Sequence, residues 1–177
     1  SGFGGEAPIG SMGSELRAIL DEHLGRLEPS TRSVLETACV FGRDIDVAMI
    51  AAIENTTRDR IERHLHEAAE AGIVASPAGA GFSFTHILLR ERLYESVDAS
   101  RRAGVHRKIG EHLLRRGLMA GAAHHLLEGR ADASSTEHAT RIAADAAAQM
   151  MRNLAFEDAA RLCERALSAL AEIDTSE

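Results

Sequence analysis

A change of periodicity at Gly72 limits the folds open to this chain of 177 residues. Before Gly72, apolar residues recur every three or four positions, and the stretch 57–71 carries the stripe of an amphipathic helix. After it, the segments IVAS and FSFT flank a turn rich in Gly, Pro and Ala, and Phe82 and Phe84 fall on one face of an alternating strand. The sequence therefore predicts a β-hairpin between helical segments.

The segments before the hairpin follow the order helix, short strand, helix, helix. After a first helix at 15–27, a helix is predicted over 30–42, with Ser30 as its N-cap. DIDV at 44–47 is extended, and two further helices follow it. Together with the hairpin as a wing, this order is that of a winged helix-turn-helix.

Helical sequence resumes after the hairpin and continues to the end of the chain. The polar stretch 129–136 interrupts it, and Ser134 with Glu137 is predicted to form a capping box for the next helix. In the last helix, small residues recur at the spacing of a tetratricopeptide-type helical hairpin. One such hairpin cannot bury its own apolar face, so it must pack on helices before it or on repeats beyond it.

We therefore predict a mainly α protein in which a winged helix-turn-helix with a small β-hairpin wing precedes an antiparallel, tetratricopeptide-like helical segment. The Gly- and Ser-rich stretch at 1–14 is expected to be a flexible leader or tag. The winged-helix domain is placed at 15–98, a helical connector at 99–130 and the start of the helical repeats at 131–177.

The charge balance does not favour nucleic acid as a partner. The chain has 20 basic and 27 acidic residues, a net charge of −7, whereas nucleic-acid binding requires a basic surface. The third helix, which reads DNA in many winged helices, carries three arginines and four acidic residues. The charged residues of this helix are Arg58, Asp59, Arg60, Glu62, Arg63, Glu67 and Glu70. Direct DNA binding is therefore not expected.

Cysteine and histidine spacing favours neither a disulfide nor a metal site. Cys39 and Cys163 lie far apart in apolar helical sequence, and we expect both to be buried free thiols. The pairs His64 with His66 and His124 with His125 lack the i, i+4 spacing of zinc ligands on a helix. No nucleophile has a matching base and carboxylate, so catalysis is not expected. No apolar run approaches the length of a membrane span.

Three stretches together resemble part of a known protein class. They are RLEPSTRSVLETACVFGRDIDVAMIAAI at 26–53, the passage AGIVASPAGAGFSFTHILLRERLYESV at 71–97 with RRAGVHRKIGEHL at 101–113, and AAHHLLEG at 122–129. This pattern is similar to the region that follows the nucleotide-binding domain in STAND-class ATPases of bacteria. The nearest relatives are LuxR-type transcriptional regulators and regulators linked to adenylate cyclases or kinases.

The resemblance implies a cytoplasmic signal-transduction protein. In that class the winged helix packs against the upstream nucleotide-binding domain and holds its ADP-bound state, and downstream helical repeats sense a protein or small-molecule inducer. ATP or ADP is thus implied for the intact protein, although this chain has no G-x-x-x-x-G-K-[ST] phosphate loop. The expected function is regulatory. A DNA-binding winged-helix factor and a plain protein-interaction scaffold remain as alternatives.

The resemblance also assigns a nucleotide-phosphate contact to His86, together with Arg90. A histidine in the first turn of a helix lies among unpaired backbone N–H groups, where an anion is favoured. The other interpretation is structural: His86 continues a core face with Leu89, Leu93 and Val97. Both interpretations stay open at the level of sequence.

Basic residues are concentrated between 90 and 108, a stretch that contains six basic and three acidic residues. The four in the second half of this stretch form a candidate interaction patch for phosphate, nucleic acid or an acidic partner domain. The alternative is a solvated helix face with i, i+4 ion pairs. The patch residues are Arg101, Arg102, Arg107 and Lys108.

Overall fold

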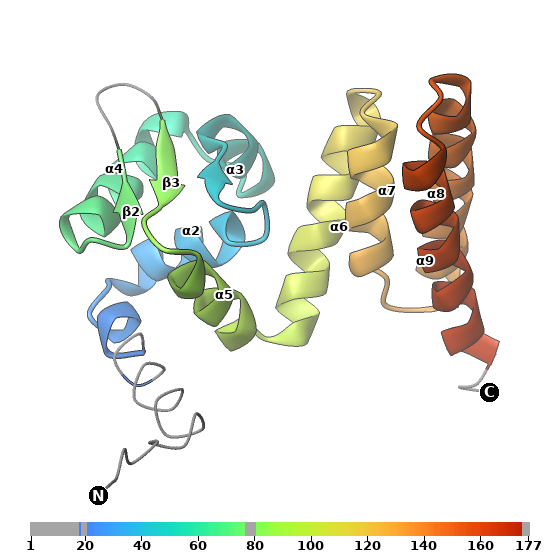
Figure 1. Ribbon diagram of the computed structural model, residues 1–177. Coiled ribbons are helices and arrows are strands. Elements are labelled where there is room, and N and C mark those ends of the chain that lie inside the picture. The colour runs from blue at the N-terminus through green and yellow to red at the C-terminus, as the bar shows by residue number, and fades with distance from the viewer. Residues whose placement is uncertain (1–17, 19–20, 77–80, 175–177) are drawn as a thin grey trace, which may run out of the picture. The chain divides into compact units, whose positions relative to one another are not determined.

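A computed structural model describes residues 18, 21–76 and 81–174 of the chain. The described part is mainly helical and contains a small antiparallel sheet, as the sequence predicts (Figure 1). It divides into two compact units, which we call the N-terminal unit (Ser1–Val97) and the C-terminal unit (Asp98–Glu177). The predicted leader, the first residues of the helix at 15–27 and the hairpin turn at 77–80 lie outside the described residues.

The described residues of the N-terminal unit form a short helical stretch at 21–25 and four longer helices. These are α2 (Pro29–Ala38), α3 (Val47–Ile53), α4 (Arg58–Glu70) and α5 (Ile87–Ser96). Polar residues begin two of them, because the side chains of Asp46 and Thr57 accept hydrogen bonds from the backbone N–H groups of the first turns of α3 and α4. The core between these helices is aliphatic and includes Leu24, Leu35, Ile50, Ile61, Leu65 and Leu93.

Helix α2 begins and ends earlier than predicted. Pro29 occupies its first turn, and Glu28 is the N-cap without a side-chain hydrogen bond, so the prediction of Ser30 as N-cap is wrong. Proline suits this position because its fixed φ is helical and its missing N–H would have no partner there. The helix ends at Ala38 rather than near Gly42.

The sheet joins three short strands, β1 (Asp44–Ile45), β2 (Val74–Ala75) and β3 (Phe82–Phe84), in the order β1-β3-β2. Antiparallel pairing of β2 with β3 confirms the predicted hairpin strands, and Phe82 and Phe84 are both buried. The pairing of β1 with the other side of β3 was not predicted, since a two-residue strand has no pattern of its own.

The C-terminal unit consists of four successive antiparallel helices (Figure 1): α6 (Ala99–Arg115), α7 (Met119–Glu128), α8 (Ala133–Arg152) and α9 (Phe156–Asp174). Each packs against the next one in the chain. Helices α7, α8 and α9 share one core, so the predicted connector and the predicted repeat hairpin are packed together. Alanines dominate this core, at positions 123, 139, 143, 146, 147, 159, 166 and 169.

Two glycines let α6 and α7 approach closely. A Cβ atom at Gly110 would lie 2.7 Å from the side chain of Leu126. A Cβ atom at Gly129 would lie 2.6 Å from the backbone nitrogen of Arg107. Neither distance is compatible with a normal contact, so these positions require glycine as long as the two helices keep their separation.

Two predictions for the C-terminal unit are wrong in detail. The capping box at the start of α8 is formed by Asp132 and Ser135, not by Ser134 and Glu137, because α8 starts at Ala133. Cys163 is exposed on α9, whereas Cys39 in the N-terminal unit is buried as predicted. The buried stripe of α9 passes through Leu162 rather than Cys163.

Helices α3, α4, α6 and α8 end in the same type of turn. In each, a residue with φ between 51° and 73° follows the C-cap, and the next backbone N–H bonds back to a carbonyl of the last helical turn. The left-handed residues are Asn55, Gly72, Gly117 and Leu154. Asparagine and glycine are usual there, but a leucine is not, because its Cβ strains the left-handed backbone.

Candidate functional site

The junction between β3 and α5 carries the predicted nucleotide-contact histidine. Thr85 fixes this junction, because its N–H donates to the carbonyl of Ile73 at 3.0 Å and its hydroxyl donates to the carbonyl of Gly72 at 2.9 Å. His86 follows as the N-cap of α5, and its carbonyl accepts from the N–H groups of Leu89 and Arg90. The predicted helix start at His86 is thus observed.

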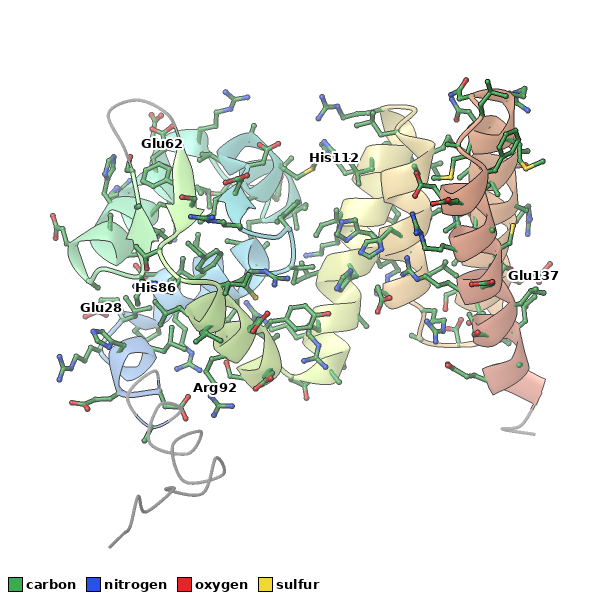
Figure 2. The ribbon with its side chains drawn as sticks, viewed as in Figure 1. Glu28, Glu62, His86, Arg92, His112 and Glu137 are labelled. Carbon is green, nitrogen blue, oxygen red and sulfur yellow. The ribbon has the colours of Figure 1, made fainter. Side chains whose placement is uncertain are left out.

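The side chain of His86, which is labelled in Figure 2, is exposed and makes no capping hydrogen bond. Leu89, Leu93 and Val97 are buried, with 6%, 0% and 4% of their surface exposed. The interpretation of His86 as a member of this core face is therefore wrong. The reason is local: at φ −133° and ψ 136°, its backbone is extended and does not continue the helical periodicity.

Arg90 lies one turn further along α5 and is engaged inside the fold. Its Nε donates a hydrogen bond to the carbonyl oxygen of Cys39 at 2.9 Å, and its guanidinium carbon lies 5.8 Å from the centre of the Tyr94 ring. The first contact ties α5 to the C-terminal end of α2. Arg90 thus supports the position of the helix, and its contact with a phosphate stays a prediction.

Two aliphatic side chains beside His86 are exposed to solvent. Ile87 and Leu88 have 49% and 47% of their surface exposed, and no other large apolar side chain in the described part of the N-terminal unit is exposed. Neither residue was among the predicted site residues. A signal was present, because three successive apolar residues at a helix start cannot all face one core. We call His86, Ile87 and Leu88 the α5 turn.

The predicted basic patch lies on α6, and its members do not share one side of the helix. Arg101, Arg107 and Lys108 are exposed, and Arg102 is half-buried. At about 100° per residue, Arg101 and Lys108 fall on one side, while Arg102 and Arg107 diverge from it in opposite directions. Asp98 adds a negative charge at the start of this helix, and hydrogen bonds from Ser100 and the Arg101 N–H lower its pKa.

A histidine cluster between α6, α7 and α9 was missed by the sequence analysis. The Nδ1 atoms of His106 and His125 lie 3.0 Å apart. Arg165 Nη1 lies 2.9 Å from Nδ1 of His124, and Arg165 Nη2 donates to Glu128 at 2.8 Å. Because a guanidinium can only donate, Nδ1 of His124 accepts and that ring is neutral. No sequence spacing indicated this cluster, since it depends on how three helices pack.

The cluster is built to stay uncharged. Burial lowers the pKa of His106 to about 4 and that of His125 to about 3. Partial burial and the Arg165 charge also lower the pKa of His124, which is exposed at its outer side. Among the described residues, no group of three or more His, Cys, Asp or Glu is arranged to hold a metal ion.

A second polar cluster joins α2 to α4. The hydroxyl of Thr31 donates to Glu67, and Nδ1 of His64 lies 2.9 Å from the same hydroxyl oxygen. Hydrogen bonding from Thr31 lowers the pKa of Glu67. Although the residue types are those of a hydrolase triad, only 1% of Thr31 is exposed, so its hydroxyl is not accessible to a substrate. The cluster fastens two helices.

The outer face of α4 has a mixed charge. Its three arginines and its four acidic residues are all exposed, and Figure 2 labels Glu62 among them. A helix that enters a DNA groove through such a face would bring carboxylates toward phosphates. The geometry therefore gives no support to α4 as a DNA-recognition helix.

Comparison with known proteins gives no match: no family model fits the chain, and no curated protein or solved structure is significantly similar to it. None of the helices in the described ranges combines the length and the apolar character that a membrane span requires.

Proposed function

We propose that this chain is the regulatory part of a bacterial signal-transduction ATPase of the STAND class, similar to LuxR-type regulators. The observation that carries the proposal is the α5 turn. Two large aliphatic side chains at 49% and 47% exposure beside an exposed histidine form a surface suited to another protein domain. In the proposal, that domain is a nucleotide-binding domain of the same polypeptide.

The N-terminal unit is proposed to be a winged helix that serves as a protein contact. The element order from α2 to β3 and the sheet order β1-β3-β2 are compatible with this fold. The mixed charge of α4 supports a role other than reading DNA. The exposed apolar residues lie on α5, outside the helix that would enter a groove.

The proposed mechanism uses the start of α5. His86 is exposed at a helix N-terminus that has no side-chain cap, and such an end attracts a phosphate through its N–H groups and its dipole. Ile87 and Leu88 would anchor the nucleotide-binding domain while it holds ADP. Exchange for ATP would release the contact, and the helical C-terminal unit would transmit the signal of an inducer to an output acting on transcription.

The test uses a polypeptide that contains this chain together with its nucleotide-binding domain. Replacing Ile87 and Leu88 by aspartate should accelerate ADP release by about tenfold or more, because two desolvated apolar contacts are lost. His86→Ala should also accelerate it. Leu118→Asp, at an equally exposed apolar position of the C-terminal unit, is the control and should have no effect. Unchanged ADP release in the aspartate variant would remove the α5 turn from the mechanism.

The alternative of direct DNA binding is tested on the chain alone. Titration with a duplex at low salt should give only weak, non-specific association. Tight binding that weakens steeply with salt and is lost on replacing Arg58, Arg60 and Arg63 would favour a DNA-binding winged-helix factor instead.

A further inference from the structure

Helix α9 has two apolar stripes, and only one of them is covered. The covered stripe repeats with offsets of three and four and packs into the core shared with α7 and α8. Its members are Ala159, Leu162, Ala166 and Ala169, each at most 9% exposed.

The second stripe faces solvent. Phe156, Leu167 and Leu170 are 55%, 66% and 39% exposed, and Ala160 and Cys163 between them are exposed as well. Successive offsets are four, three, four and three residues, the spacing of the a and d positions of a heptad. We call these five residues the α9 surface. Its spacing fits an α-helix as the partner, because strands and loops do not match a 3.5-residue repeat.

The turn before α9 adds a second, independent sign of a contact surface. Leu154 adopts the left-handed backbone that Gly72 and Gly117 adopt at equivalent helix ends, and 75% of its surface is exposed. A glycine there would relieve the strain, and an exposed leucine gains nothing within the unit. A strained, exposed leucine is explained when its side chain is needed by a partner.

The border of the α9 surface is acidic. Glu157 and Glu164 follow Phe156 and Cys163 directly, so they occupy successive e positions of the heptad, and both are exposed. The arginines of α9 are directed elsewhere: Arg161 pairs with Asp158, and Arg165 pairs with Glu128 on α7. A partner helix would therefore meet two carboxylates along this border.

A second copy of the chain in the antiparallel orientation does not fit this border. In an antiparallel pair of α9 helices, e positions face e positions, so the glutamates of one copy would oppose those of the other. Within the unit, successive described helices pack against one another, and α9 exposes a second apolar stripe beside its covered one. The surface continues an established mode of packing and calls for a helix of opposite charge.

We propose that the α9 surface binds an amphipathic helix of a partner protein whose apolar a and d residues are bordered by arginine or lysine. The partner's stripe covers Phe156, Leu167 and Leu170, and its basic residues pair with Glu157 and Glu164. This interaction is independent of the nucleotide-linked function proposed above.

The test measures binding of designed helical peptides about three heptads long by fluorescence anisotropy. One peptide carries Leu at a and d with Arg at e, and its matched control carries Glu at e. The chain should bind the basic peptide about tenfold more tightly than the acidic one, because two ion pairs replace two repulsions. Failure to bind either peptide, or equal binding of both, would overturn the proposal.

Variants of the chain separate this site from general stickiness. Leu167→Asp should abolish binding, and its helical circular dichroism should be unchanged because the side chain is mostly exposed. Leu118→Asp should bind like the wild type. Exchanging Glu157 and Glu164 for lysine should reverse the peptide preference. If the lysine variant still preferred the basic peptide, the proposal of a basic partner helix would be contradicted. Dimerisation of the wild type that Leu167→Asp removes would also contradict it, and would favour a second copy of the chain as the partner.

Discussion

The Nδ1 atoms of His106 and His125 face each other across the α6–α7 contact at 3.0 Å. One ring must donate through Nδ1–H and the other must accept, so the second ring carries its proton on Nε2. A first added proton can be placed on the Nε2 of the donor ring. A second added proton would have to bind Nδ1 of the acceptor ring, where its N–H would face the Nδ1–H of the donor ring. The pair therefore opposes protonation of both rings.

This pair predicts a loss of stability of the C-terminal unit in acid. Burial lowers the pKa of His106 to about 4 and that of His125 to about 3, from 6.5 for both. Below pH 6.5 the unfolded chain binds protons that the folded unit excludes, so stability falls as the pH falls toward 4. The two histidines together contribute a slope of at most about 2.7 kcal/mol per pH unit.

Urea unfolding followed by circular dichroism between pH 7 and pH 4.5 measures this slope. The double variant His106→Asn, His125→Asn should show a shallower dependence than the wild type, because asparagine amides do not titrate. His138→Asn, at an exposed position of α8, is the control. Equal slopes in the wild type and the double variant would mean that the histidine pair does not exclude protons.

Substitution by alanine should have opposite effects on stability at two glycines, one inside the contact of α6 with α7 and one outside it. Gly129→Ala should destabilise the chain by about 2 kcal/mol, because its Cβ would lie 2.6 Å from the Arg107 nitrogen and 2.9 Å from the Ala103 carbonyl oxygen. Gly104→Ala should stabilise it by up to about 1 kcal/mol, since nothing lies within 4 Å and alanine favours the helix. Thermal unfolding of both variants checks the pair. Similar shifts in both would contradict the close approach at Gly129.

The link from α5 to α2 predicts a stabilising role for Arg90. Arg90→Met keeps the aliphatic stem and removes the hydrogen bond to Cys39, and it should lower the free energy of unfolding by about 1–3 kcal/mol. Arg58→Met on the exposed face of α4 should change it by less than about 0.5 kcal/mol. Chemical denaturation distinguishes the two. A loss no larger than that of Arg58→Met would show that the bond is replaced by water.

The turn at Leu154 predicts that stability can be gained. Leu154→Gly should raise the free energy of unfolding by about 1 kcal/mol, because glycine adopts φ near 62° without strain. Gly117→Ala, at the same position of the turn after α6, should lower it by a similar amount. Differential scanning calorimetry measures both shifts. A destabilised Leu154→Gly variant would mean that the leucine packs within the unit.

Local features of the fold could be predicted from the sequence. The alternation around Phe82 and Phe84 predicted the hairpin strands. Thr57 and Gly72 marked the two ends of α4, because N-caps and left-handed helix ends depend on residues that are neighbours in the sequence. The start of α8 was misplaced by two residues, since Asp132 and Ser134 are both competent N-caps. Neighbouring residues of similar chemistry leave such boundaries undecided.

Features that depend on tertiary packing could not be predicted. Whether His86 joins the core face depends on its extended backbone, and whether Cys163 is buried depends on which side α9 turns to α8. His106 meets His125 only because Gly110 and Gly129 bring two helices together. In each case the residue was visible in the sequence, while its neighbour was set by a contact distant along the chain.

The order of strands in the sheet has a consequence for synthesis on the ribosome. Strand β3 lies between β1 and β2 but is made after both of them. Until Phe84 has left the exit tunnel, the earlier strands have no partner for their backbone groups, and Phe84, which is fully buried in the finished unit, cannot complete the core. We therefore expect the helices from α2 to α4 to remain loosely docked in the nascent chain and to become protease-resistant together, in one late step, when β3 emerges.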